Sequence, residues 1–324
     1  MDAGRISSLI IEVARGIFFT SLVFLTVAFI PFLSAMMLIM IPLPVLFYTE
    51  KLGRTGGAAV LIFSLLIVGA AQQAAGSQLT IAVFLILGCL GLIISMILKR
   101  RLSIGWTVAL AACSGLVFMG ALIIIYSAMQ GLPPWEMIYR YIHTMVQENI
   151  KLYAQLDLPV EQMQFIKENA GRISRALTYT FPALSLVIIA AIVIINIIPA
   201  RILFRMRGLN PPEFGDLSRW KASDYLVWLL IAAGISLLLP GLAVKMLAMN
   251  VVIICLFAYL VQGLAIIEFF FQKKRAPLFL RLLFYFLILI QQYLLLFVIA
   301  AGLFDLWIDF RKLHAPAPDV DQRP

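Results

Sequence analysis

The chain consists largely of apolar stretches that reach or exceed the length needed to cross a lipid bilayer. About 20 predominantly apolar residues span the hydrocarbon layer as one helix. The sequence is 63% hydrophobic and only 13% charged, whereas soluble domains carry about 25% charged residues. This composition excludes a soluble globular protein. We therefore predict an all-α fold, a polytopic bundle of transmembrane helices.

Eight or nine spans are predicted. Seven of them are placed at residues 57–72, 79–98, 104–128, 177–199, 223–240, 245–271 and 278–304. The stretch from Gly16 to Tyr48 would be about 50 Å long as one helix, which exceeds a hydrocarbon layer of about 30 Å. We interpret it as two short helices, 16–30 and 33–48, that turn back near Pro31. A single long, kinked span is the alternative.

Basic residues fall in short clusters between the apolar stretches, and these clusters predict the topology. The strongest are Lys99 to Arg101, the arginines between 201 and 207, and Lys273 to Arg275. The positive-inside rule assigns such loops to the cytoplasm, so the net charge of +9 requires no nucleic acid partner. Loops 49–56, 99–103, 200–222 and 272–277 are predicted inside, and 73–78 and 129–176 outside. Nine spans would then put the C-terminus outside.

The polar segment 129–176 predicts an extracytoplasmic amphipathic helical hairpin. Apolar residues recur at helical spacing through Trp135, Ile142, Ile150 and Tyr153. The hairpin is interpreted as a lid on the bundle, or as a layer in the lipid headgroups, or as a docking site for a partner. The predicted organisation is an N-terminal membrane half at 1–128, the hairpin at 129–176, a C-terminal membrane half at 177–311, and a flexible tail at 312–324.

Motifs for catalysis or cofactor binding are missing from the sequence. It contains no phosphate-binding Gly-x-x-x-x-Gly-Lys-Ser/Thr loop and no zinc-binding His-Glu-x-x-His. Cys89, Cys113 and Cys255 are isolated, and His143 and His314 cannot form a histidine-rich metal site. We therefore predict a protein that is not an enzyme and has no cofactor or metal.

Polar residues within the apolar stretches are the remaining candidates for function. Gln291 and Gln292 lie in the middle of the predicted span 278–304, near the bilayer midplane, where amides need partners. They are predicted to bind a small solute in a cavity; a hydrogen-bonded clamp between helices is the alternative. Glu268 is expected to pair with the basic cluster that follows it. Asp305 and Asp309 are expected at the outer headgroups, where charge is solvated.

Two segments carry a resemblance to a known family. The closing "GLFDLWIDFRKL" and the early "IPLPVLFYTEKLGRTGGAAVL" resemble the YybS-like family of bacterial membrane proteins, a family of unknown function. The resemblance covers most of the chain and implies a setting in the bacterial inner membrane. The N-terminal half is also similar in architecture to the S-components of energy-coupling-factor transporters, with a helix pair, the segment "PLPVLFY", a basic turn and a Gly/Ala-rich helix.

Two functions remain open. The first is an integral inner-membrane protein that binds a small solute through Gln291 and Gln292 as a transport-associated subunit. The alternative is a structural or assembly protein that binds other envelope proteins. The expected partners are the lipid bilayer together with a small solute or a membrane protein, and no nucleic acid is expected.

Overall fold

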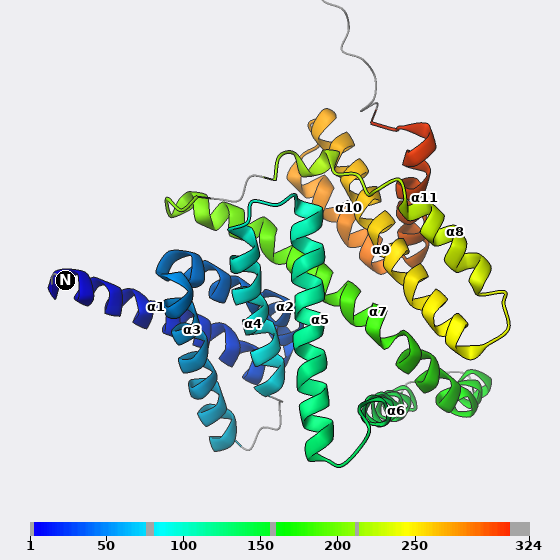
Figure 1. The fold of residues 1–324 in the computed structure, drawn as a ribbon, viewed down its shortest axis with the longest axis horizontal. Coiled ribbons are helices and arrows are strands. Elements are labelled where there is room, and N and C mark those ends of the chain that lie inside the picture. The colour runs from blue at the N-terminus through cyan, green and yellow to red at the C-terminus, as the bar shows by residue number, and fades with distance from the viewer. Residues whose placement is uncertain (1–2, 76–80, 156–159, 211–213, 312–324) are drawn as a thin grey trace, which may run out of the picture. The chain divides into compact units, whose positions relative to one another are not determined.

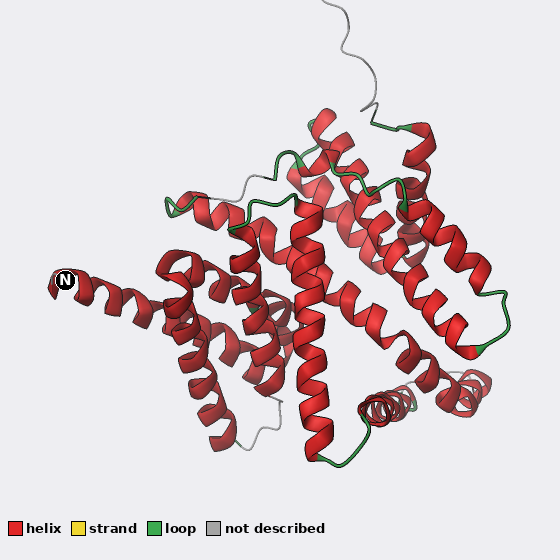
Figure 2. Ribbon diagram, in the orientation of Figure 1, coloured by secondary structure: helices red, strands yellow, loops and turns green. Residues whose placement is uncertain are grey.

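A computed structural model describes residues 3–75, 81–155, 160–210 and 214–311, and the expected all-α fold is confirmed. The described residues form helices and loops without a strand (Figure 2). The chain divides into two compact units, residues 1–214 and 215–324, which are described separately below. The boundaries expected at 128 and 176 both fall within the first unit, and the expected tail at 312–324 lies outside the described residues.

The first unit contains seven helices among its described residues. They are α1 (Ala3–Phe29), α2 (Pro31–Met40), α3 (Pro42–Ala74), α4 (Ile81–Leu98), α5 (Ile104–Met129), α6 (Pro134–Tyr153) and α7 (Val160–Met206) (Figure 1). Helix α3 packs against both α1 and α4, and α7 packs against α5 and α6. Small residues permit close approach in this core, because a side chain at Gly91 would collide with the carbonyl of Pro42.

The N-terminal apolar stretch turns near Pro31, as expected, but the helices that follow differ from the prediction. The chain leaves helical geometry at Ile30 (φ −116°, ψ 88°), and Pro31 begins α2, which is only 10 residues long. A new helix starts at Pro42, and α3 is broken inside the expected loop 49–56, at Gly53 (φ 81°, ψ 177°), so it consists of two helices on either side of a kink. The chain folds sharply there, because a Cβ atom at Gly57 would lie 2.8 Å from the Cα atom of Thr49, whereas residues eight apart in a straight helix are separated by about 12 Å. The break expected between residues 48 and 57 is therefore present, in a backbone conformation that glycine permits, but the helix expected at 33–48 is divided between α2 and the first part of α3.

Residues 129–176 contain α6 and the first part of α7, which pack against each other, while their expected position outside the membrane stays a prediction. However, α7 does not end where the polar segment ends. It is 47 residues long in all and continues through the apolar span expected at 177–199, past Pro182 and Pro199. The amphipathic part and the membrane-crossing part of α7 thus belong to one helix.

The second unit contains η1 (Leu217–Arg219), α8 (Leu226–Ser236), α9 (Leu242–Lys273), α10 (Leu278–Ile290) and α11 (Gln292–Ile308). Helices α9 and α11 approach each other more closely than most side chains allow. A Cβ atom at Gly302 would lie 2.0 Å from the carbonyl oxygen of Tyr259, and one at Gly263 would lie 2.0 Å from that of Val298. Glycine at both positions is therefore what permits this contact, as at many helix interfaces in membranes.

Six of the described helices are long and apolar enough to cross a membrane, and seven spans result if the bent pair α10–α11 is counted as one. Eight or nine were predicted. The difference arises because α2 has 10 residues and α8 has 11, well short of the ~20 that a span requires, and because part of the first apolar stretch merges into α3.

The glycine contact between α9 and α11 leads to a prediction. In Gly302→Ala the new methyl group would collide with the carbonyl oxygen of Tyr259, so the two helices must separate. We expect the free energy of unfolding to fall by about 1–3 kcal/mol, as for other overpacked sites, seen as a lower Tm in detergent. Gly234→Ala in α8 is the matched control. It meets nothing within 4 Å and gains up to about 1 kcal/mol of helix propensity. Equal effects of the two changes would contradict this packing.

Candidate functional site

A carboxylate near the end of α11, Asp305, lies in a buried polar cluster of the second unit. The residue is only 3% exposed. Its Oδ2 accepts hydrogen bonds from Nε2 of Gln262 at 3.1 Å and from Nη2 of Arg311 at 2.7 Å. Its Oδ1 accepts the backbone N–H of Phe310 at 3.0 Å. Burial of a charge is costly unless it is paired and hydrogen-bonded, and both conditions are met here.

The turn that ends α11 brings Arg311 back to Asp305. Helix α11 stops because Asp309 adopts the left-handed conformation (φ 43°, ψ 63°), and its N–H bonds to the carbonyl of Asp305 at 3.2 Å. Aspartate tolerates this conformation better than most residues. The reversal places the guanidinium of Arg311 against a carboxylate six residues earlier, and the two side chains are 0% and 2% exposed.

The cluster also holds the loop around η1. Nη1 of Arg311 donates to the carbonyl oxygens of Ser218 and Trp220, both at 2.9 Å. The side chain of Gln262 completes the link, because its Oε1 accepts the backbone N–H of Ala222 at 3.0 Å while its Nε2 binds Asp305. Three segments distant in sequence, the η1 loop, α9 and the end of α11, are therefore joined through the buried residues Gln262, Asp305 and Arg311.

The expectation for Asp305 is therefore wrong. It was placed at the outer headgroups as a solvated charge, but it is buried and paired with Arg311. A second expectation is affected as well. Residues 200–222 were assigned to the cytoplasm and the chain after α11 to the outside, yet Arg311 is hydrogen-bonded to Ser218 and Trp220. The two assignments cannot both hold.

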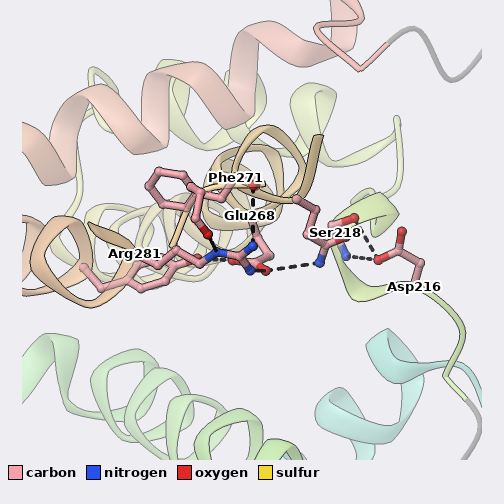
Figure 3. A network of polar contacts seen from close by, with 8 residues as sticks. Asp216, Ser218, Glu268, Phe271 and Arg281 are labelled. Carbon is pink, nitrogen blue, oxygen red and sulfur yellow. Dashed lines mark hydrogen bonds and ion pairs between the residues drawn. The ribbon is translucent and has the colours of Figure 1, made fainter. Parts of the chain in front are cut away.

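A second polar group links the end of α9 to the start of α10. Nη1 of Arg281 donates to Oε1 of Glu268 at 2.9 Å, and the hydroxyl of Tyr285 donates to Oε2 at 2.8 Å. Nε of Arg281 donates to the carbonyl of Ala276 at 3.0 Å. Figure 3 shows this group on one side, and on the other the bonds that Asp216 makes at the start of η1. Glu268 was expected to pair with Lys273 to Arg275, but its ion-pair partner is Arg281.

These contacts show that the pair α10–α11 turns back. Arg281 in α10 binds Glu268, and Asp305 in α11 binds Gln262. The two partners are six residues apart on α9, about 9 Å along its axis, whereas a straight helix from Arg281 to Asp305 would cover about 36 Å. The chain therefore returns toward the part of α9 from which it departed, so that α11 packs against α9 and α10 contacts it at Glu268 and Phe271 near its end.

The turn occurs at Gln291. This residue leaves helical geometry (φ −93°, ψ 99°) and is at once the last cap of α10 and the first cap of α11. The two helices meet there at a bend of 106°. The N–H of Gln291 still bonds to the carbonyl of Leu287 at 2.8 Å, and its own carbonyl accepts the N–H of Leu294 at 3.0 Å. The continuous span expected at 278–304 is therefore wrong.

Gln291 and Gln292 thus stand at a break between helices and not within one helix. Both side chains are exposed on the second unit. The break leaves backbone groups near these amides, because the end of one helix and the start of the next lack intrahelical partners. That Gln291 and Gln292 bind a ligand stays a prediction.

The remaining candidates from the sequence are not brought together. Among the described residues, no three His, Cys, Asp or Glu side chains are grouped closely enough to hold a metal ion. His143 lies on α6, where its Nδ1 is 3.1 Å from the hydroxyl of Ser174, and His314 lies outside the described residues. The absence of enzymatic activity stays a prediction.

Sequence reasoning missed Gln262, Arg281 and Arg311. Gln262 and Asp305 are 43 residues apart, so no local spacing connects them. A weak signal existed for Arg311, since a basic residue six positions after an aspartate at a helix end can fold back on it. A polar residue within each apolar stretch, Gln262 in one and Asp305 at the end of the next, was the other signal.

Comparison with known proteins gives one match. The model of a family described as "Predicted membrane protein (DUF2232)" matches residues 18–306. No curated protein and no solved structure matches the chain. The matched range includes the break at Gln291, both glutamines, and every residue of the Asp305 cluster except those of the terminal turn.

The Asp305 cluster leads to a prediction about stability. Asp305→Ala leaves the guanidinium of Arg311 buried without its counter-charge, and we expect the free energy of unfolding to fall by about 3–5 kcal/mol. The measurement is Tm in detergent. Asp224→Ala is the matched control. Asp224 pairs with Lys221, but its side chain is 68% exposed, so we expect a change of at most about 1 kcal/mol. Similar losses in both variants would argue against a buried cluster.

The return of α10–α11 leads to a prediction about topology. With Lys273 to Arg275 in the cytoplasm, the end of α11 should lie there too. A fluorescent reporter that matures only in the cytoplasm should fluoresce when fused after residue 311, and alkaline phosphatase at the same point should be inactive. Fusions after residue 131 should behave in the opposite way. Active phosphatase after residue 311 would show that the pair crosses the membrane.

Proposed function

The chain belongs to the DUF2232 family of predicted membrane proteins, and we propose that it is a multi-pass protein of the bacterial cytoplasmic membrane that binds a small solute as a transport-associated subunit. The proposed site is the break between α10 and α11, with Gln291 and Gln292 as the ligand-binding side chains. The single observation that carries the proposal is the interruption of an apolar helix pair at two adjacent amides.

The first support is the chemistry of backbone within a membrane. Hydrocarbon offers no hydrogen bonds, so non-helical backbone at membrane depth is tolerated only where protein or an aqueous cavity satisfies it. Helix breaks of this kind are typical of solute sites in transporters, where the ends of half-helices face the substrate. The backbone at Gln291 is such a break.

The second support is the exposure of the amides. A clamp between helices of the second unit would bury the side chains of Gln291 and Gln292 between them, but both are exposed on this unit. Each amide offers two donors and an acceptor with two lone pairs, which suits a polar, uncharged part of a small molecule. A helix face that only contacts lipid gains nothing from two amides.

The third support is that side-chain hydrogen bonds hold both ends of the pair. The start of α10 is held by the bonds of Arg281 to Glu268, and the end of α11 by those of Arg311 to Asp305. The bend at Gln291 is therefore presented on two anchored helices. Anchored helices suit a binding site, because they position its polar groups before the ligand arrives and so lower the entropy cost of binding.

Replacement of both glutamines tests the proposal. We expect gently purified protein to retain a small molecule in native mass spectrometry, and the variant Gln291→Leu/Gln292→Leu to lose it. The Tm of the variant should stay unchanged or rise, because the lost partners are solute and water. The matched control is Gln162→Leu/Gln164→Leu, which changes two exposed glutamines of α7 and should keep the bound molecule.

Two results would count against solute binding at the break. The first is wild-type protein without a retained molecule, or a double variant that retains it fully. The second is a fall in Tm of the double variant that corresponds to a loss of about 1–3 kcal/mol in the free energy of unfolding, which is the cost of leaving buried polar groups unpaired. That result would show that the amides hold protein segments together and would favour the alternative, a structural or assembly protein that binds other envelope proteins.

A further inference from the structure

Helix α6 begins five residues after the last residue of α5 and runs in a different direction from α5. Figure 1 shows α6 nearly along its own axis while α5 runs across the view. The connection contains Gly131 in the left-handed region (φ 65°), and Pro134 begins the new helix. Because α5 is apolar enough to span the membrane and ends at Met129, α6 starts close to the level at which the hydrocarbon layer ends.

One side of α6 is docked on α7. The side chain of Ile150 is buried. The ring of Trp135 stacks on that of Tyr179, with centroids 6.3 Å apart, and His143 meets Ser174. This inner side fixes the rotation of α6 about its axis, so the environment of its other sides can be assigned.

The exposed surface of α6 is divided into an apolar and a polar sector. At ~100° per residue, the apolar sector covers about a third of the helix. Its exposed apolar members are Tyr141, Leu152, Tyr153, Met145 and Trp135, which are 66, 60, 46, 42 and 41% exposed. Asn149 also falls in this sector, and its side-chain amide donates to the carbonyl of Met145 at 2.8 Å. The polar sector lies on the other side of the docked face and contains Arg140, Thr144, Gln147, Glu148 and Lys151. A helix that faced only water or only lipid would not keep both.

We propose that α6 lies in the headgroup layer of the bilayer, at the end of α5 opposite to the basic loop at 99–101, with its apolar sector turned toward the acyl chains. The proposed partner of this sector is lipid. Aromatic residues support lipid over a protein partner, because Trp135, Tyr141 and Tyr153 stand near the borders of the apolar sector, and Trp and Tyr are enriched at the level of the headgroups.

The net charge of α6 is also consistent with lipid as the partner and indicates which lipid headgroups it would bind. Helix α6 carries two acidic residues, Glu136 and Glu148, and two basic residues, Arg140 and Lys151, so these charges sum to zero. Arg140 and Glu136 also form an ion pair at 3.0 Å. The surface binding of α6 should therefore depend on apolar burial and not on anionic lipid. This proposal stands independently of the solute site.

Spin labels on α6 test the proposal in the full chain. A cysteine-free background removes Cys89, Cys113 and Cys255, and single cysteines then carry labels at Met145 and Leu152 in the apolar sector. Glu148 and Lys151 in the polar sector are the controls. All four side chains are exposed, so the labels should not disturb folding. The protein is placed in phosphatidylcholine vesicles, and collisions of each label with oxygen and with a water-soluble nickel chelate are measured.

We expect the ratio of oxygen to nickel collisions to be several-fold higher at 145 and 152 than at 148 and 151. Vesicles with added phosphatidylglycerol should give the same ratios. Labels at 145 and 152 that collide mainly with nickel would show that the sector faces water, which would overturn the proposal. Labels shielded from both reagents would also overturn it, since protein would then cover the sector. Spin–spin broadening that unlabelled protein removes would identify that cover as a second copy.

Discussion

The ion pair between Asp305 and Arg311 is the interaction on which the second unit depends. Helices in lipid gain little from apolar contact with one another, because the acyl chains are as apolar as the side chains. Close packing at Gly263 and Gly302 lets α9 and α11 touch, but small residues alone do not determine which other segments join them. The buried charges do, because Asp305 and Arg311 find their hydrogen bonds only where the η1 loop and Gln262 come together.

The break at Gln291 follows from the same arrangement. With the start of α10 bound to Glu268 and the end of α11 bound to Gln262, the intervening residues cannot form one straight helix. The chain pays for the turn in unsatisfied backbone groups, and the amides of Gln291 and Gln292 add further polar atoms at the same place. Polar atoms gathered in an apolar stretch need a partner from outside the second unit, and the proposed solute is that partner.

The sequence predicted the features that depend on local pattern. Apolar runs led to the all-α fold, the spacing of residues such as Ile142 and Ile150 led to α6, and Pro31 marked a turn. Features that depend on tertiary contacts were not predictable in this way. Nothing near Gln291 resembles a helix breaker, since neither proline nor glycine stands there. Asp305 looked like a solvated charge because its partners, Gln262 and Arg311, lie on another helix and beyond a turn. The charges and glycines of 49–56 predicted a separation of two helices, and the break does lie in this stretch, but its confinement to Gly53 was not predictable from the pattern.

Helix α7 has a mechanical consequence. It is a single element of 47 residues, a rod of about 70 Å, and its first part carries the docked α6. Tilting of α6 would therefore act first on the part of this rod that precedes Pro182. Pro182 and Pro199 each remove a backbone hydrogen bond from the rod. Compliance is concentrated at these two positions, so a thickening or thinning of the bilayer would be absorbed as bending there before it reached the end of the helix at Met206.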